Sequence, residues 1–367
     1  MAYTPDPTDS SQPVSGVKAS TAAAEFRALK QYIAALAGLT PITSISALTV
    51  QQLNGGQLAG LRNMLINGRG AISQRIGNAN LNLTTTAVYG VDRWACLSAV
   101  AASGTIFAAQ VSGDSTSPTA VRFAKTAGTY DGTLYMGQVL ESADCVHMTS
   151  KPFAFSFRAR VGSSFTGSLL PQVFIYRGTV ADQGLAGAIA SSWTGWTNET
   201  YSAQDGSVPN LSTVFQTYKY VGTFSGTVGE VFVGIGRATD ASAGSANDYL
   251  DITDIQFEVG TVATPFEQRP HGLELELCKR YYEVGAASQL WSGYVVNASV
   301  YYVSTRYSTA KRVAPTLTYS DVANSSFPAG LVTFLNTSTD GFTVSKISNG
   351  TANSGYYQFN WIANARL

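Results

Sequence analysis

The sequence predicts a mainly β protein built from short antiparallel strands, and its composition gives three reasons. Only 13% of its residues are charged, against roughly 25% in an average soluble domain, so Ser, Thr, Asn and Gln must hydrate much of the surface. The chain contains 35 Gly and 19 Tyr, as expected for strands joined by many turns. Its 367 residues suffice for two or three domains with separate cores. We expect an N-terminal segment (1–60), a sandwich domain (61–270) and a C-terminal β module (271–367).

Residues 1–60 are expected to attach the chain to another protein. The first 18 residues are rich in Pro and polar groups and should be extended unless a partner holds them. A short helix follows, with an N-cap at Ser20 or Thr21 and a stop at Gly38. Isolated helices below about 12–15 residues are marginal in water, so its coiled-coil-like apolar seam needs identical copies or a docking surface, although packing onto its own chain is an alternative. A polar spacer completes the segment. The seam consists of Ala22, Phe26, Leu29, Ile33 and Leu36.

Residues 61–270 are expected to fold as one antiparallel β-sandwich. Turn signals such as Asp131-Gly132 separate short runs of β-branched and aromatic residues. Many short strands without a convincing interior helix favour two packed sheets of jelly-roll type over a barrel. Such sandwiches often bind carbohydrate, but a fold alone fixes no function. The expected strands are 94–101, 105–112, 121–124, 133–141, 153–161, 169–176, 215–223, 230–235 and 249–258.

The stretch 250–283 marks the transition to a second β unit. Ile252 and Phe257 lie on an alternating pattern that Gly260 and Pro265 end. After Pro270 leucines alternate with polar residues up to a pair of tyrosines, where the C-terminal module begins. A module this small has exposed sheet edges and would benefit from partners. Its expected strands are 294–307, 315–320, 330–336, 341–347 and 355–364.

The same stretch resembles a pattern in bacteriophage tail fibre and receptor-binding proteins, Q-x-E-x-G-x-x-A-T-P-F-E-x-R followed by E-L-x-x-C-x-R-Y-Y-E. The family's L-I-N-G-x-F-x-x-x-Q-R, D-R-W, S-F-x-x-K/R and terminal A-R-L segments also have counterparts here, although Arg69 and Gly70 stand where the family usually has an acidic residue and a Phe. The resemblance covers roughly 61–283 and the extreme C-terminus. The matching residues are Leu65 to Gly68, Gln74, Arg75, Asp92 to Trp94, Ser156 to Arg158, Gln256, Glu258, Gly260, Ala263 to Glu267, Arg269, Glu274, Leu275, Cys278, Arg280 to Glu283 and Ala365 to Leu367.

The resemblance implies a homotrimeric virion appendage that attaches to a phage tail or capsid protein through residues 1–40. It also implies adsorption to a host-surface polysaccharide or lipopolysaccharide. The chain would be assembled in the host cytoplasm and reside in the virion. The alternative is a purely structural collar, head fibre or baseplate adaptor without a receptor.

The net charge and the distribution of apolar residues exclude some classes of binding partner. Lys+Arg and Asp+Glu both number 23, so no net positive charge attracts nucleic acid. No segment approaches the roughly 20 apolar residues that span a bilayer, and the first residues are too polar for a secretory signal. The three cysteines lack metal-binding spacing and are expected to be buried thiols. We therefore expect no nucleic acid, no membrane insertion and no cofactor.

The sequence favours binding over catalysis. His147 and His271 are its two histidines, and neither lies beside a nucleophile motif. Asp240, Asp248, Asp251 and Asp254 could hold a hard cation only if their loop curled. A glycosidase needs two carboxylates that can come from anywhere in a fold, so a depolymerase is the third, less favoured hypothesis. We expect no catalytic and no metal site.

Aromatic and amide side chains form the candidate glycan site. Sugar rings stack on aromatics, while amides and hydroxyls meet sugar hydroxyls. The long segment 179–208 carries such residues between two expected strands. The alternative is that its tryptophans cap the core or an inter-subunit seam. The candidates are Trp193, Trp196, Asn198 and Tyr201 there, and Trp291 and Tyr294 in the C-terminal module.

Overall fold

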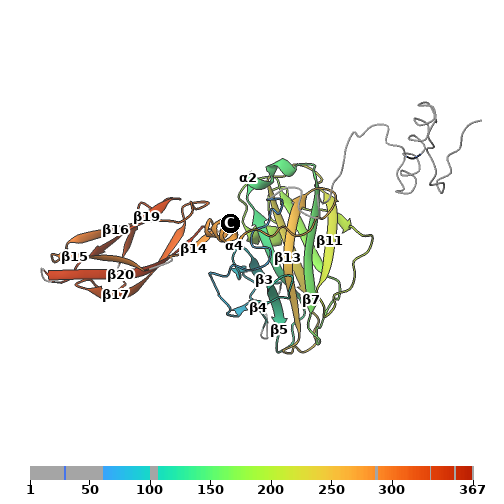
Figure 1. Cartoon of the computed structure of the whole chain (residues 1–367), viewed down its shortest axis with the longest axis horizontal. Helices are drawn as coiled ribbons and strands as arrows, with labels where there is room; N and C mark the ends of the chain where they lie inside the picture. Colours follow the sequence, from blue (N-terminus) through green and yellow to red (C-terminus); the bar gives the residue numbers. More distant parts are fainter. Residues whose placement is uncertain are drawn as a thin grey trace, which may run out of the picture. The chain divides into compact units, whose positions relative to one another are not determined.

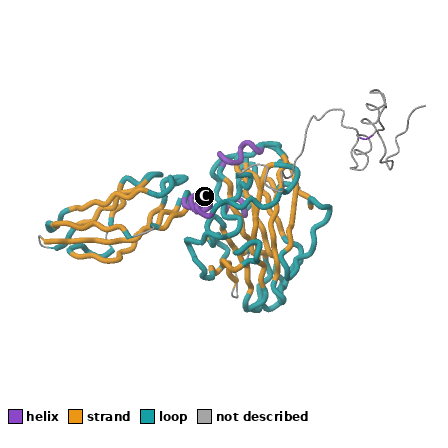
Figure 2. Tube along the Cα trace, viewed as in Figure 1, coloured by secondary structure: helices purple, strands orange, loops and turns teal. Residues whose placement is uncertain are grey.

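The structure is a computed structural model. It describes Leu29 and residues 61–99, 106–285, 288–330, 332–350 and 353–365. The chain divides between Leu58 and Ala59, and everything below except Leu29 belongs to the second unit. Two β regions make up that unit, one in blue to yellow and one in orange to red in Figure 1. Strands far outweigh helices in it (Figure 2). No described helix combines the length and the apolar character needed to cross a membrane.

The first β region contains two antiparallel sheets. One has seven strands in the order β1-β4-β5-β13-β7-β11-β10, and the other has six in the order β2-β3-β6-β12-β8-β9. The strands are β1 (Leu81–Asn82), β2 (Val88–Tyr89), β3 (Ala95–Ser98), β4 (Ile106–Ser112), β5 (Thr119–Lys125), β6 (Thr133–Leu140), β7 (Pro152–Val161), β8 (Gln172–Gly178), β9 (Thr197–Asn198), β10 (Tyr201–Ala203), β11 (Gln216–Thr223), β12 (Glu230–Ala238) and β13 (Tyr249–Val259).

One hydrophobic core joins the facing sides of these two sheets. Phe123 and Phe157 enter it from the seven-stranded sheet, and Met136 and Val233 enter it from the six-stranded sheet. Side chains alternate along a strand, so alternate residues of the central strands point into this core, except across an irregularity in β13 between Thr253 and Gln256. The predicted mainly β, antiparallel sandwich is therefore confirmed, while its jelly-roll type stays a prediction.

Short helices occupy the connections. They are α2 (Ser142–Cys145), the 3₁₀ helix η1 (Val146–Met148), α3 (Leu185–Ile189) and α4 (His271–Lys279).

The second β region has a core and sheets of its own. Its longest strand, β20, pairs with β14, β15 and β17, while β16, β19 and β18 form a separate three-stranded sheet. The core between them is aromatic and includes Tyr357, Phe359 and Trp361. The strands are β14 (Tyr282–Val284), β15 (Gln289–Val295), β16 (Val300–Arg306), β17 (Thr316–Ser325), β18 (Thr333–Leu335), β19 (Gly341–Ile347) and β20 (Asn353–Asn364).

All nine strands expected in the sandwich are present, and two expectations nearby need correction. The predicted strand 294–307 is two strands, because the chain turns at residues 296–299, where Ala298 has a φ of 60°. The alternating leucines after Pro270 belong to the helix α4, where Cys278 is buried. The predicted boundary at 270 and the trimer stay predictions. Of the predicted helix seam, Leu29 is helical and 53% exposed, and Ala22, Phe26, Ile33 and Leu36 lie outside the described residues.

The tyrosines that end the family pattern contact arginines of the sandwich. The guanidinium of Arg93 lies 3.4 Å from the ring centroid of Tyr281, and that of Arg75 lies 3.6 Å from the ring of Tyr282. The Tyr281 hydroxyl also donates to the carboxylate of Glu141, which Arg280 pairs at 2.9 Å. These contacts tie the start of the C-terminal region to the residue that follows β6, to the loop before β3 and to the segment before β1.

Asn63, together with Glu267 of the family pattern, fastens the segment 63–72 onto β13. Asn63 is 3% exposed, its Oδ1 accepts from the backbone N–H of Leu65 (3.0 Å) and of Phe257 (3.1 Å), and its Nδ2 donates to the Ile255 carbonyl at 2.9 Å. The Glu267 carboxylate accepts from the Asn63 N–H at 2.7 Å. In this chain the pattern thus closes buried backbone hydrogen bonds between segments about 200 residues apart.

We predict that Asn63→Ala destabilises the protein strongly. The change leaves two buried N–H groups and one carbonyl without partners, and each costs about 1–3 kcal/mol when unsatisfied. Urea unfolding should show the loss, whereas Asn82→Ala, at an exposed position of β1, should stay within about 0.5 kcal/mol of wild type. Equal stability of the two variants contradicts the assigned role of Asn63.

Candidate functional site

The structure separates the four glycan candidates of the segment 179–208. Trp193 is 5% exposed, lies in a small core under α3, and donates its indole N–H to the Gly184 carbonyl at 2.9 Å. Tyr201 donates to the Val173 carbonyl at 2.6 Å and packs edge-on against Tyr220 beside the main core. The Trp193 ring is therefore enclosed, whereas the Tyr201 ring lies beside the core and is partly exposed. Trp196 is half-buried and Asn198 is exposed.

Trp291 and Tyr294 lie on opposite faces of β15. Trp291 packs into the aromatic core, 4.5 Å from the Tyr301 ring and 6.0 Å from the Tyr357 ring. Tyr294 is 67% exposed on the other face. Their separation of three residues forces this outcome, because side chains alternate along a strand. The structure does not bring them together, and glycan binding by either stays a prediction.

Trp196 and Asn198 join a set of rings on the outer face of the six-stranded sheet. Tyr176 on β8 pairs in register with Asn198 on β9 and with Phe232 on β12. Ring centroids are 5.0 Å apart for Tyr176 and Trp196. The set continues with Phe174, 6.0 Å from Tyr176, and with Tyr135 on β6, 5.0 Å from Phe174. We call Tyr135, Phe174, Tyr176 and Trp196 the aromatic face; all four are partly exposed.

Glycines make room for rings to lie flat on this sheet. A Cβ at Gly137 would fall 2.1 Å from Cε2 of Phe232, and one at Gly234 would fall 2.7 Å from its Cζ. A Cβ at Gly236 would fall 2.7 Å from Cε2 of Phe174. Because Gly137 and Gly234 pair directly, the middle of the sheet lacks side chains while its neighbours carry rings. The buried Phe232 ring lies over these glycines, and Phe174, Tyr176 and Trp196 pack against the small core under α3 while each stays partly exposed.

Hydrogen-bonding groups surround the rings. Among the described contacts, none engages the hydroxyl of Tyr135 or of Tyr176, and the Asn198 amide is exposed on the same row of the sheet. Burial, together with the neighbouring Tyr135 and Tyr201, raises the pKa of Tyr176 to about 12. Its hydroxyl therefore remains a donor at any physiological pH. A ligand with apolar faces and hydroxyl edges fits this combination.

The segment carrying Trp196 is anchored by a buried carboxyl. Glu230 of β12 is 0% exposed and accepts the backbone N–H of Gln183. Gln183 in turn accepts the Thr194 N–H at 2.5 Å. Burial raises the pKa of Glu230 to about 8, an effect that the Gln183 bond and Arg312 oppose and Asp182 reinforces.

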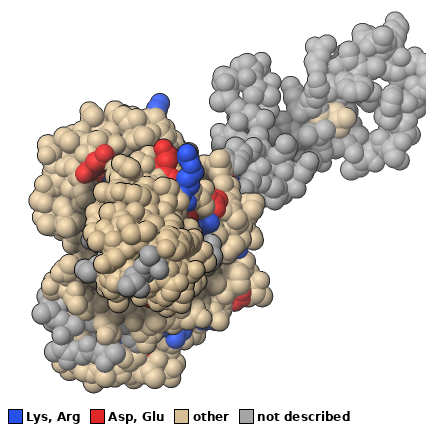
Figure 3. Space-filling model, turned by 90° about the vertical axis from the view of Figure 1, so that its left-hand side faces the viewer, with Lys and Arg blue, Asp and Glu red and all other residues tan. Residues whose placement is uncertain are grey.

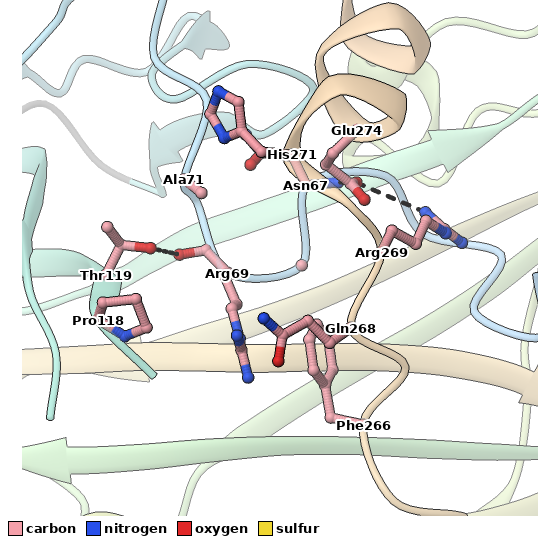
Figure 4. Close-up of a pocket in the computed structure, with 11 residues that line it drawn as sticks. Asn67, Arg69, Ala71, Pro118, Thr119, Phe266, Gln268, Arg269, His271 and Glu274 are labelled. Atoms are coloured by element: carbon pink, nitrogen blue, oxygen red, sulfur yellow. Dashed lines mark hydrogen bonds and ion pairs between the residues drawn. The ribbon is translucent and has the colours of Figure 1, made fainter. Parts of the chain in front are cut away.

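A separate cavity of about 390 Å³ lies where the family-pattern segments meet (Figure 4). Arg69 on its wall pairs with Asp254 at 2.6 Å, and Arg269 lies 3.5 Å from Glu274, which also accepts the Asn67 N–H. Arg69, Arg269 and Glu274 therefore already have ion-pair partners, which suits a structural junction better than a ligand site. The lining residues are Asn67, Gly68, Arg69, Ala71, Pro118, Thr119, Phe266, Gln268, Arg269, His271 and Glu274.

Three of the aspartates considered as cation ligands have arginine partners instead. Asp248 binds Arg237, Asp251 binds Arg122 at 2.7 Å, and Asp254 binds Arg69. Asp240 lies 3.8 Å from the Lys125 ammonium. No group of metal-ligating side chains occurs within the described ranges.

Sequence reasoning missed Tyr135, Phe174 and Tyr176. A signal was present, because each lies at alternate positions of an expected strand, opposite in parity to the core residues Met136, Val173 and Ile175. What the sequence lacked was the order of the strands, which places β6, β12 and β8 side by side.

We predict that Glu230→Gln flattens the pH dependence of stability. Between pH 4.5, the ordinary carboxyl value, and about 8 the folded state holds a proton that the unfolded state has lost. The free energy of unfolding therefore falls as pH rises through this window. Urea unfolding across it should show a smaller decline in the variant. Parallel curves for the two proteins contradict the assignment, and Asp205→Asn, at an exposed position, is the control.

The chain was compared with known proteins at the level of sequence and of fold. No protein-family model and no curated protein sequence matches it. Among solved structures, the enzymatically active domain of tailspike protein 4 of bacteriophage CBA120 is 13% identical with a TM-score of 0.30, covering 61% of this chain and 25% of that one. The xylan-binding CBM22-1 domain of Paenibacillus barcinonensis Xyn10C is 12% identical with a TM-score of 0.28, covering 51% and 99%. The family 30 carbohydrate-binding module of a Clostridium thermocellum cellulase is 10% identical with a TM-score of 0.25, covering 50% and 94%. These are distant likenesses between β proteins, and the chain spans only a quarter of the phage domain.

Proposed function

We propose that this protein binds a glycan through the aromatic face of its six-stranded sheet. The observation that carries the proposal is the run of Tyr135, Phe174, Tyr176 and Trp196, with successive centroids 5.0–6.0 Å apart, on a sheet whose central positions are glycine. Aromatic rings left partly open on one face match the apolar faces of sugar rings. The tyrosine hydroxyls and Asn198 supply the polar contacts that orient them.

The biological setting of the proposal is a phage virion. Its support is the sequence resemblance to tail fibre and receptor-binding proteins, including Gln256, Glu258 and Glu267 of the family pattern. In this setting residues 1–40 attach to a tail or capsid protein, three identical chains assemble, and the glycan is a polysaccharide or lipopolysaccharide of the host surface. The protein is a binding component rather than an enzyme and uses no cofactor.

We predict that Tyr176→Ala and Trp196→Ala each weaken adsorption to host cells. Each removes a ring on which an apolar sugar face would stack, so we expect a loss of up to about tenfold in affinity, or about 1.4 kcal/mol. Binding of purified wild-type and variant protein to host cells and to their extracted surface polysaccharide measures this.

Tyr302→Ala is the matched control, because Tyr302 is exposed on β16 of the other β region. It should bind as wild type does. Urea unfolding of each variant separates lost binding from lost folding. If the folded Tyr176 and Trp196 variants adsorb normally, the rings serve only to pack the segment 179–196 on the sheet. If wild-type protein does not adsorb but is present in virions, the structural-appendage alternative holds.

We also predict that the full-length protein is a trimer in solution. The C-terminal region exposes large apolar side chains on its outer faces, including Leu290, Val322 and Ile347, which identical copies would cover. Light scattering should give about three times the 38.8 kDa of one chain. A stable monomer contradicts the trimer and leaves the glycan proposal standing.

A further inference from the structure

We propose that Arg122 and Arg160, on the seven-stranded sheet, form a binding site for one oxyanion group of an acidic saccharide. The two guanidinium groups flank Asp251, and we call the three residues the arginine clamp. The site lies on a different sheet from the aromatic face. It rests on the proposed function only for the claim that a saccharide carries the anion.

Strand register builds the clamp. Asp251 of β13 pairs directly with Arg122 of β5 on one side and with Arg160 of β7 on the other. Arg122 contacts Asp251 with two donors, at 2.7 and 3.0 Å, and Arg160 contacts it at 3.0 Å. All three residues therefore lie in one row on the sheet face that is turned away from the core.

The burial of the three residues decides which charge a ligand meets. The Asp251 side chain is 0% exposed, whereas those of Arg122 and Arg160 are 24% and 25% exposed. Two cations share one carboxylate, so the clamp has an excess of one positive charge. The carboxylate lies beneath its partners, and an approaching group reaches guanidinium edges first.

Neighbouring rings hold both guanidinium groups in place. Arg122 lies 3.5 Å from the ring centroid of Tyr249, and Arg160 lies 4.6 Å from that of Phe215. Arg160 also donates from its Nη2 to the Ser112 carbonyl at 3.4 Å. Rings and Asp251 restrict the rotamers before any ligand arrives, so little entropy is lost on binding.

The charges around the arginine clamp do not cancel its excess positive charge. Arg69 and Arg158 lie on the same side of the sheet, but Asp254 and Asp114 pair with them at 2.6 Å each. These two arginines and two aspartates balance. A single excess charge with paired planar donors fits one carboxylate, sulfate or phosphate. A nucleic acid backbone, which requires several cations along its length, fits it less well.

Binding to three immobilised polymers tests the site, namely dextran sulfate, polygalacturonate and neutral dextran. We expect both acidic polymers to bind, with an affinity that falls as salt rises. Free inorganic sulfate should compete with them for the site. The stronger of the two identifies the preferred oxyanion. Neutral dextran should bind no better to wild type than to the clamp variants.

Single substitutions are the matched variants, since removing both arginines would leave Asp251 buried and unpaired. Arg122→Gln and Arg160→Gln should each lower affinity for the acidic polymers about tenfold, and Arg160→Lys should lose less because it keeps the charge. Arg306→Gln removes an exposed cation from β16 and should change nothing.

The proposal is overturned if the acidic polymers do not bind, or if folded Arg122→Gln and Arg160→Gln bind like wild type. It is also overturned if Arg306→Gln loses as much, or if a single-stranded oligonucleotide binds more tightly with the same dependence on Arg122 and Arg160. Tyr176→Ala separates the two sites: it should reduce host-glycan adsorption and leave sulfate competition intact. If only the binding of acidic polymers fails, the proposal of an oxyanion site at the arginine clamp is rejected, and the proposal of a glycan site at the aromatic face stands.

Discussion

The register of two central strands, β12 and β13, decides what both sides of the sandwich present. Side chains alternate along each strand, so a shift of one residue would exchange core and surface. With β12 paired as it is to β6 and β8, Val233 faces the core and Phe232 faces outward over Gly137. With β13 paired to β5 and β7, Asp251 lies between two arginines. The aromatic face and the arginine clamp are both consequences of this pairing.

Buried polar contacts maintain the register. In β13 the pairing with β7 shifts between Thr253 and Gln256, and Asp254 there has a φ of 51°. The irregularity is accompanied by specific partners, since Ile255 donates to the Gly68 carbonyl and accepts from Asn63, and Asp254 pairs with Arg69. The segment 63–72 thus supplies the bonds that an irregular strand cannot make to its neighbours. The segment 63–72 therefore has a structural role in this chain that is independent of any ligand.

The two proposed sites lie on opposite sheets and would recognise different chemical features of a ligand. The aromatic face would contact sugar rings, and the arginine clamp would contact an acidic group. Ring stacking is short-ranged and largely insensitive to salt, whereas the clamp acts through charge and weakens as ionic strength rises. A surface polysaccharide offers both sugar faces and acidic substituents. The mostly uncharged surface visible in Figure 3 is consistent with the low charged fraction of the chain, 13%, and makes a local excess of one charge more distinct.

The sequence by itself determined the class of fold, because alternation and turn residues are local properties. Nine of the thirteen sandwich strands were predictable, and so was the burial of Cys96, Cys145 and Cys278. The sequence also identified Trp196 and Asn198 as candidate glycan contacts. It identified Trp193 and Tyr201 as well, but these two side chains pack inward. The tertiary structure alone decided which strands are neighbours. That order gathers Tyr135, Phe174 and Tyr176 from two strands and puts Arg122 beside Asp251 across 129 residues. Strand order depends on contacts between distant segments, which no local pattern encodes.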